Sequence, residues 1–131
     1  MSDPNRKLDP NPKTKYGDRK IPLQLVPLSA SIAIARGLAE GRDKYGFYNW
    51  RDRPVPLMTY IGAIGRHLGA FIEGEFDDPD STNKSHLDGA IASLAIIIDA
   101  MSLGDGSYID DRPNTSSHGA LKALTEGSRK L

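Results

Sequence analysis

The feature that most constrains the fold is the spacing of apolar residues between positions 57 and 71. They recur at alternating steps of four and three, which places them on one face of an α-helix: Leu57, Ile61, Ile64, Leu68 and Phe71. Pro56 suits the start of this helix, because the first turn needs no backbone N–H there. Pro79 disfavours helical backbone at Asp78, so we expect the helix to fray within residues 75–84.

Two more segments have helical spacing. Residues 28–45 follow Pro27 and carry apolar side chains at Leu28, Ile32, Ala35 and Ala39. From about Ser85 to residue 103, one stripe comprises Leu87, Ile91, Leu94, Ile98 and Met101, with Ile96 on the opposite side. A helix that is apolar nearly all round is buried on several sides. We therefore predict an all-α fold, a helical bundle completed by oligomerisation into a homodimer or homotetramer.

The two ends of the chain lack this periodicity. Residues 1–20 are rich in Pro, Asp, Asn and Lys, so we interpret them as an N-terminal arm without regular structure. Residues 21–103 are the predicted helical domain. Residues 104–131 are rich in Gly, Ser, Asp and Asn, which indicates a peripheral tail with one short, weak helix at 119–127.

Composition narrows the class of protein. Seventeen Lys and Arg residues balance seventeen Asp and Glu residues, so the chain lacks the positive surplus that favours binding to nucleic-acid polymers. No apolar run is long enough to cross a membrane, and the polar N-terminus lacks the apolar core of a signal peptide. The absence of cysteine excludes disulfides, thiolate zinc sites and thiol nucleophiles. We expect a cytoplasmic protein of one domain that binds neither a nucleic-acid polymer nor a membrane.

The acidic turn after residue 72 carries the first candidate site. At about 100° per residue, Glu75 falls on the apolar stripe of the preceding helix, where a carboxylate should not face open water. Asp78 follows at three residues and His67 precedes on the flank of the stripe, so all three can converge on one pocket. Carboxylate oxygens are ligands for the divalent cations that bind phosphates, which indicates a metal role. A solvated acidic turn is the equally weighted alternative.

The start of the third predicted helix lies a short turn away from these carboxylates. Asp88 is a candidate metal ligand there, although an acidic residue in the first turn more commonly stabilises the helix dipole. His86 has three interpretations: it coordinates metal, it holds a phosphate oxygen, or it caps and packs. Glu40 and Asp43 repeat the Glu-x-x-Asp spacing off the apolar stripe of residues 28–45, where a solvated face is the better interpretation.

The loop at residues 44–51 has an unusual composition. It reads Lys-Tyr-Gly-Phe-Tyr-Asn-Trp-Arg, with four aromatic rings, two cations and one amide in eight positions. Such side chains suit stacking on a base, hydrogen bonding to its edge and neutralising phosphate. An aromatic plug over the end of the bundle explains the same composition.

Taken together, these segments resemble the phage dATP/dGTP diphosphohydrolase family, relatives of MazG-type nucleotide pyrophosphohydrolases, and within it the MazZ type. The resemblance rests on four segments in order, from Lys20 to Ala100: KIPLQLVP, KYGFYNWR, YIGAIGRHLGAFIEGEFDDPDS and SHLDGAIASLAIIID. It implies a MazG-like all-α enzyme of phage deoxynucleotide metabolism, including the 2-aminoadenine pathway. Such an enzyme hydrolyses dGTP or dATP to the monophosphate and pyrophosphate with Mg²⁺ or Mn²⁺.

The resemblance also implies site residues. It assigns catalysis to Glu75, Asp78, His67 and His86, and substrate binding to Lys44, Tyr45, Asn49, Trp50 and Arg66. Metal ligation falls to Glu75 and Asp78, with Asp88 as a third candidate. Two departures stand out: Gly89 occupies the second histidine position of the H-L-x-H-A pattern, and the third helix lacks a paired-carboxylate motif.

Two rival functions compete with this hydrolase. One is a non-catalytic helical nucleotide-binding or assembly protein, whose acidic turn is only a solvated cap. The other is a phosphohydrolase that releases inorganic phosphate stepwise. The sequence contains no Gly-rich phosphate loop, no Gly-x-Ser-x-Gly elbow and no His-Asp dipeptide, which excludes the mechanisms that need them.

Overall fold

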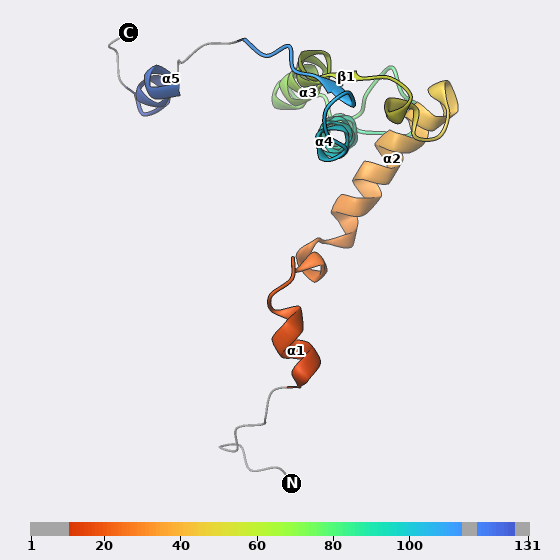
Figure 1. Cartoon of the computed structure of the whole chain (residues 1–131). Helices are drawn as coiled ribbons and strands as arrows, with labels where there is room; N and C mark the ends of the chain where they lie inside the picture. Colours follow the sequence, from red (N-terminus) through yellow and green to blue (C-terminus); the bar gives the residue numbers. More distant parts are fainter. Residues whose placement is uncertain (1–10, 114–117, 128–131) are drawn as a thin grey trace. The chain divides into compact units, whose positions relative to one another are not determined.

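The computed structural model describes residues 11–113 and 118–127, and it confirms the all-α fold class. Its elements in chain order are α1 (Pro12–Gly17), a 3₁₀ turn (Leu23–Leu25), α2 (Leu28–Tyr45), a second 3₁₀ turn (Asn49–Arg51), β1 (Val55–Pro56), α3 (Leu57–Ile72), α4 (His86–Ser102), β2 (Tyr108–Ile109) and α5 (His118–Thr125) (Figure 1). The chain divides into two compact units, residues 1–32 and 33–131. None of the described helices is both long and apolar enough to cross a lipid bilayer.

The first unit holds a helix where the sequence interpretation placed none. α1 begins at Pro12, whose missing N–H costs nothing in a first helical turn. The side chain of Asn11 accepts a hydrogen bond from the backbone N–H of Lys13, which caps the helix. The prediction of an arm without elements is therefore wrong for residues 12–17, where the Asn11 cap and Pro12 begin a helix that has no apolar periodicity.

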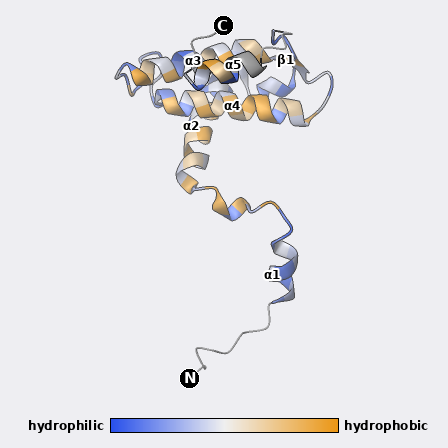
Figure 2. Cartoon of the chain, turned by 90° about the vertical axis from the view of Figure 1, so that its left-hand side faces the viewer, coloured by the Kyte–Doolittle hydropathy of each residue, from blue (hydrophilic) through white to orange (hydrophobic). Residues whose placement is uncertain are grey.

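The packed core of the second unit lies between α3 and α4, which run side by side (Figures 1 and 2). Leu57 and Ile64 of α3 pack with Ala90 and Ile97 of α4, and all four are buried. The rings of Tyr60 and Tyr108 pack against this cluster. The starts of both helices agree with the sequence, which set α3 at Leu57 and α4 just after Ser85. The expected fraying within residues 75–84 is wrong, because α3 already ends at Ile72.

α4 turns a different face to α3 than the apolar stripe suggests. The buried apolar residues of α4 are Ala90, Ala92, Ile97 and Ala100. Ile98 in the predicted stripe is 67% exposed, and Figure 2 shows apolar residues along the length of this helix. Small side chains let two helices approach closely, and the larger apolar residues of the same helix remain outside this contact.

α2 approaches α4 closely through Gly37. A Cβ atom at this position would clash with the Cβ of Ala92 and would lie 2.7 Å from the backbone oxygen of Asp88. Glycine is therefore required here by the contact itself. This approach brings Gly37 of α2 against Asp88 and Ala92 in the first half of α4.

Part of the predicted peripheral tail is built into the second unit. β2 pairs in parallel with β1, with Val55 opposite Tyr108. The backbone N–H of Met58 donates to Oδ1 of Asp111 at 2.8 Å, which satisfies a free donor at the start of α3. The interpretation of residues from 104 onward as peripheral is therefore wrong for residues 107–111. The short helix expected at 119–127 is confirmed as α5.

Candidate metal and substrate site

The turn between α3 and α4 brings the acidic residues back to the start of α4. Asp77 and Ser85 form an antiparallel bridge, and the backbone N–H of His86 donates to the oxygen of Phe76 at 3.0 Å. The N–H of Asp78 donates to the oxygen of Lys84 at 3.2 Å. Residues 76–86 therefore form a closed turn with Asp78 on its inner side, where only 9% of the residue is exposed.

Glu75 does not continue the apolar stripe of α3, so the prediction of its position is wrong. α3 ends at Ile72, and Gly74 follows with φ of 99°, a left-handed conformation that glycine adopts without steric penalty. The side chain of Glu75 is consequently 52% exposed. Periodicity could not reveal this, because the helix stops one turn before the carboxylate.

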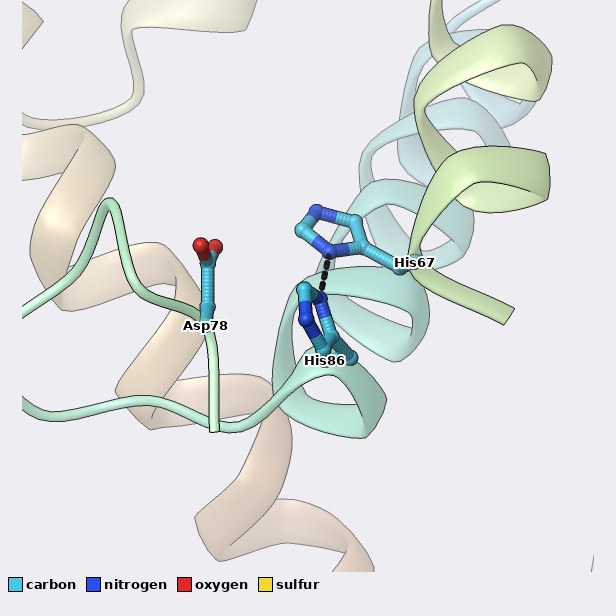
Figure 3. Close-up of side chains that lie close together, drawn as sticks. All are labelled: His67, Asp78 and His86. Carbon is cyan, nitrogen blue, oxygen red and sulfur yellow. Dashed lines mark hydrogen bonds between the residues drawn. The ribbon is translucent and has the colours of Figure 1, made fainter. Parts of the chain in front are cut away.

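Three predicted residues from three parts of the chain meet in one group (Figure 3). His67 comes from α3, Asp78 from the turn and His86 from the first residue of α4. Each offers one ligand atom, and these atoms lie within 4.8 Å of one another. Nδ1 of His67 and Nδ1 of His86 are 2.9 Å apart. Asp78 and His86 are buried, so this group is the candidate metal centre.

Glu75 fixes the tautomer of His86. Its Oε1 lies 2.6 Å from Nε2 of His86, and a carboxylate only accepts, so Nε2 carries the hydrogen. In the neutral ring, Nδ1 of His86 then presents a lone pair toward His67. A histidine that ligates a metal through one nitrogen commonly donates its other N–H to a carboxylate in this way.

The surroundings of His67 favour its neutral form. Burial lowers its pKa, and the charge of Lys84 acts in the same direction. The neutral ring is the form that binds a metal. The ring also lies against Gly89, where a Cβ atom would be 2.6 Å from Nε2 of His67. Gly89, which departs from the family pattern, therefore makes room for His67.

Lys84 links this group to α2. Its Nζ lies 3.7 Å from Oδ2 of Asp78 and 3.0 Å from Oε2 of Glu40. Burial acts to raise the pKa of Glu40, but hydrogen bonds from Lys84, Ser81 and Lys44 outweigh it and hold the pKa below its ordinary value. Glu40 is only 20% exposed. The interpretation of Glu40 as part of a solvated face is therefore wrong, because the turn folds over it.

Asp88 lies in the cap of α4 and outside the metal group. Its backbone N–H donates to Oγ of Ser85 at 3.2 Å, and its Oδ2 accepts from the backbone N–H of Ser85 at 3.1 Å. This reciprocal pair is a capping box. The same Oδ2 lies 3.6 Å from Nη1 of Arg36. Of the two interpretations of Asp88, the geometry shows the second: Asp88 stabilises the start of the helix.

The loop after α2 places the predicted substrate-binding residues in different surroundings. Tyr45, Asn49 and Trp50 together line a small pocket of about 130 Å³. Lys44 instead pairs with Glu40 at 3.3 Å. The remaining predicted residue, Arg66, is exposed and folds back along α3 toward Gly62.

The loop is fastened to α4 through Asp99. Nε1 of Trp50 donates to Oδ2 of Asp99 at 2.7 Å, and the guanidinium of Arg51 donates to both oxygens of the same carboxylate. Asn49 donates to the backbone oxygen of Gly46 at 3.1 Å. The polar edges of Trp50 and Asn49 are therefore engaged within the protein, and Asp99 was missed as the residue that positions this loop.

A larger pocket, of about 280 Å³, lies beside this loop and includes residues that sequence reasoning did not single out. Arg42, Phe47 and Tyr48 line it together with Trp50. The sequence identified Phe47 and Tyr48 only as aromatic residues of the loop. Their position beside α2 follows from the backbone conformation of the loop, which the sequence did not predict. Nothing in the sequence singled out Arg42, because it precedes the aromatic loop at residues 44–51.

The comparisons with known proteins agree with the family resemblance. The family model described as dATP/dGTP diphosphohydrolase, N-terminal, matches residues 10–112. A dATP/dGTP diphosphohydrolase of Salmonella phage PMBT28 is 31% identical over 83 residues, which are 63% of this chain. Those residues span 28% of the phage protein, so the likeness concerns a minor part of that relative. No solved structure matches the chain.

Proposed function

Because the chain belongs to the dATP/dGTP diphosphohydrolase family, we propose that it is a metal-dependent nucleotide pyrophosphohydrolase. Its reaction is the conversion of dGTP or dATP to the monophosphate and pyrophosphate. The observation that carries this proposal is the convergence of His67, Asp78 and His86 on one point. A buried carboxylate beside two imidazoles is a set of ligands, whereas a solvated acidic turn requires no such convergence.

The donor set fits a divalent metal. His67 and His86, whose Nδ1 atoms lie 2.9 Å apart, would hold such an ion together with Asp78. Imidazole donors suit Mn²⁺ better than Mg²⁺, which prefers oxygen ligands. Of the two cofactors that the family resemblance implies, we therefore favour Mn²⁺. Asp78 supplies the anionic oxygen.

The residues around this group suit a triphosphate. A bound divalent ion supplies a Lewis acid for phosphoryl oxygens and lowers the pKa of a water ligand. Lys84 and Arg36 carry positive charge that offsets the negative charge developing on the leaving pyrophosphate. Glu75 holds the ring of His86 in the orientation for ligation. We assign Glu75 to this orienting role and Asp88 to the helix cap.

The test compares Asp78→Asn with Asp77→Asn. Both variants remove one carboxylate from the same turn, but Asp77 is exposed and lies outside the metal group. We expect Asp78→Asn to lose pyrophosphate release from dGTP and the stabilisation that Mn²⁺ gives to thermal unfolding, whereas Asp77→Asn keeps both. Equal activity of the two variants would refute the metal assignment.

The product separates this function from its rivals. Pyrophosphate with dGMP supports the pyrophosphohydrolase, whereas inorganic phosphate indicates a stepwise phosphohydrolase. Nucleotide binding without either product, in the presence of Mn²⁺ or Mg²⁺, indicates the non-catalytic binding protein. The reaction is to be followed with dGTP and dATP in parallel.

We further propose the setting in which this enzyme acts. The relative with a matching segment comes from a phage, which supports a role in phage deoxynucleotide metabolism in the host cytoplasm. The supply of monophosphate for a 2-aminoadenine pathway is one such role. The exposed apolar residues of α3 and α4 support an assembly of two or four copies.

A further inference from the structure

The pocket of about 280 Å³ beside α2 has an apolar floor and an aromatic wall. Leu38 and Ala39 of α2 form the floor, and Phe47, Tyr48 and Trp50 form the wall. The metal group does not include any of these residues. Apolar walls with a few placed donors are typical of sites for flat organic ligands.

Part of the aromatic wall is held in place by contacts within the protein. The indole of Trp50 is fixed by its hydrogen bond to Asp99, and the ring of Tyr48 lies 5.3 Å from it, centroid to centroid. Tyr48 has φ of 50°, a left-handed conformation that costs a non-glycine residue free energy. Phe47 and Tyr48 nevertheless remain 76% and 58% exposed. Strain that leaves two rings in water is typical of a binding site.

Arg42 is the cation that lines this pocket. Its guanidinium lies 5.6 Å from the centre of the Phe47 ring, and its Nε donates to Asp43 at 3.1 Å. Within residues 11–113 and 118–127, its two Nη groups make no hydrogen bond or ion pair. None of the described carboxylates lines the pocket. The side-chain groups that face a ligand's polar edge are therefore chiefly donors.

Such a site distinguishes the two purines. The O6 and N7 atoms of guanine are adjacent acceptors, which a guanidinium contacts with two parallel hydrogen bonds. Adenine places an amino donor next to N7, which repels one of these donors. An aromatic pocket with an arginine fork therefore favours guanine.

We propose that this pocket binds the base of a guanine nucleotide, which stacks on the aromatic wall while Arg42 donates to O6 and N7. This assignment rests on the proposed function, because the metal group gives the direction in which the phosphates extend. Ala39 also lines a second pocket, of about 160 Å³, that contains Lys84 and Arg36. Because Lys84 lies 3.7 Å from Asp78, a nucleotide with its base here extends over α2 toward the metal group.

The test uses Trp50, the only tryptophan of the chain, as a reporter inside the pocket. The full chain is titrated with dGMP and with dAMP in EDTA, and tryptophan fluorescence is recorded. We expect a saturable change with dGMP and about tenfold weaker binding of dAMP, the discrimination of one bidentate contact. Removal of metal separates base binding from catalysis.

Three variants sharpen the comparison. Arg42→Ala removes the fork, and Arg42→Lys keeps the charge but cannot make two parallel hydrogen bonds. We expect both to bind dGMP and dAMP equally. Arg53→Ala is the control, because Arg53 is exposed and lies outside this pocket. It should keep the tenfold preference for dGMP.

The outcomes separate this inference from the proposed function. A preference for dGMP that depends on Arg42, without pyrophosphate release from dGTP, supports the base site and overturns the hydrolase. Pyrophosphate release with a purine preference unchanged in Arg42→Ala and Arg42→Lys overturns the base site and leaves the hydrolase standing. A fluorescence of Trp50 that does not respond to dGMP also overturns the base site.

Discussion

Gly89 decides where the imidazole of His67 lies. A Cβ atom at this position would stand 2.6 Å from Nε2 and 2.8 Å from Cε1 of the ring. We expect Gly89→Ala to displace His67 and to weaken Mn²⁺ binding by about tenfold or more, the usual effect of disturbing a ligand's support. Isothermal titration with Mn²⁺ measures this affinity.

The control for this change is Gly65→Ala. A Cβ atom at Gly65 meets no atom within 4 Å, so the alanine only favours the helix, by about 0.5–1 kcal/mol. Gly65→Ala should raise the melting temperature and leave the affinity for Mn²⁺ unchanged. Equal Mn²⁺ affinity of Gly89→Ala and the parent would show that His67 is not a ligand.

A substitution of Glu75 tests whether this carboxylate orients the ring of His86. Because its side chain is 52% exposed, Glu75→Gln should fold with nearly unchanged stability in the absence of metal. The amide can still accept from His86 but without charge, so we expect Mn²⁺ affinity and activity to fall by roughly 10- to 100-fold. Melting curves with and without Mn²⁺, together with pyrophosphate release, measure both effects. Parental activity in this variant would exclude the role.

At the scale of elements, the link between the loop and α4 depends on pH. Hydrogen bonds from Arg51, and then from Trp50, hold the pKa of Asp99 below its ordinary value of 3.8. A lowered pKa in the folded state means that the link stabilises the protein above pH 3.8 and is lost as the pH falls through the folded value. Trp50 fluorescence should therefore stay constant near neutral pH and change only below pH 3.8.

Asp99→Asn provides the comparison for this titration. The asparagine has no charge at any pH, so its fluorescence at neutral pH should already differ from that of the parent. It should also lack the acid transition, while far-UV circular dichroism follows global unfolding separately. An acid transition shared by both proteins would place its origin outside Asp99.

The elements of the second unit were largely predictable, but their contacts were not. Apolar spacing and prolines located α3 and α4, because these signals act within a few residues of the helix ends. The buried face of α4 was not predictable, because the burial of Ala90 and Ile97 depends on their packing against α3. The pairing of Tyr108 with Val55 joins residues distant in sequence, and neither segment alone carries a signal for it.

At the scale of the whole molecule, the exposed apolar residues of α3 and α4 lead to a prediction on assembly. Leu94 and Ile98 of α4 are 41% and 67% exposed, and Ile61 and Phe71 of α3 are also exposed. Removing such residues from water in a symmetric contact stabilises an oligomer. We expect light scattering of the parent to give a mass of two or four chains.

Ile98→Glu places a charge among these exposed apolar residues, so the mass should fall toward that of one chain, 14.3 kDa. Ile109→Glu, on β2, changes a residue that is 51% exposed and lies outside these helices, and it should leave the mass unchanged. A parent protein of 14.3 kDa would contradict the prediction of an oligomer.

The sequence by itself determined the all-α class, the starts of the main helices and the family, because periodicity, capping residues and ordered motifs are properties of short segments. It also named His67, Asp78 and His86. Only the tertiary structure decided that these three converge, that Glu75 serves His86, and that Arg42 faces the aromatic pocket. The physical reason is that the turn at Gly74 only ends α3, by hydrogen bonds among neighbouring residues, whereas the contact of Gly89 with His67 and the bond of Glu75 to His86 join residues of different elements.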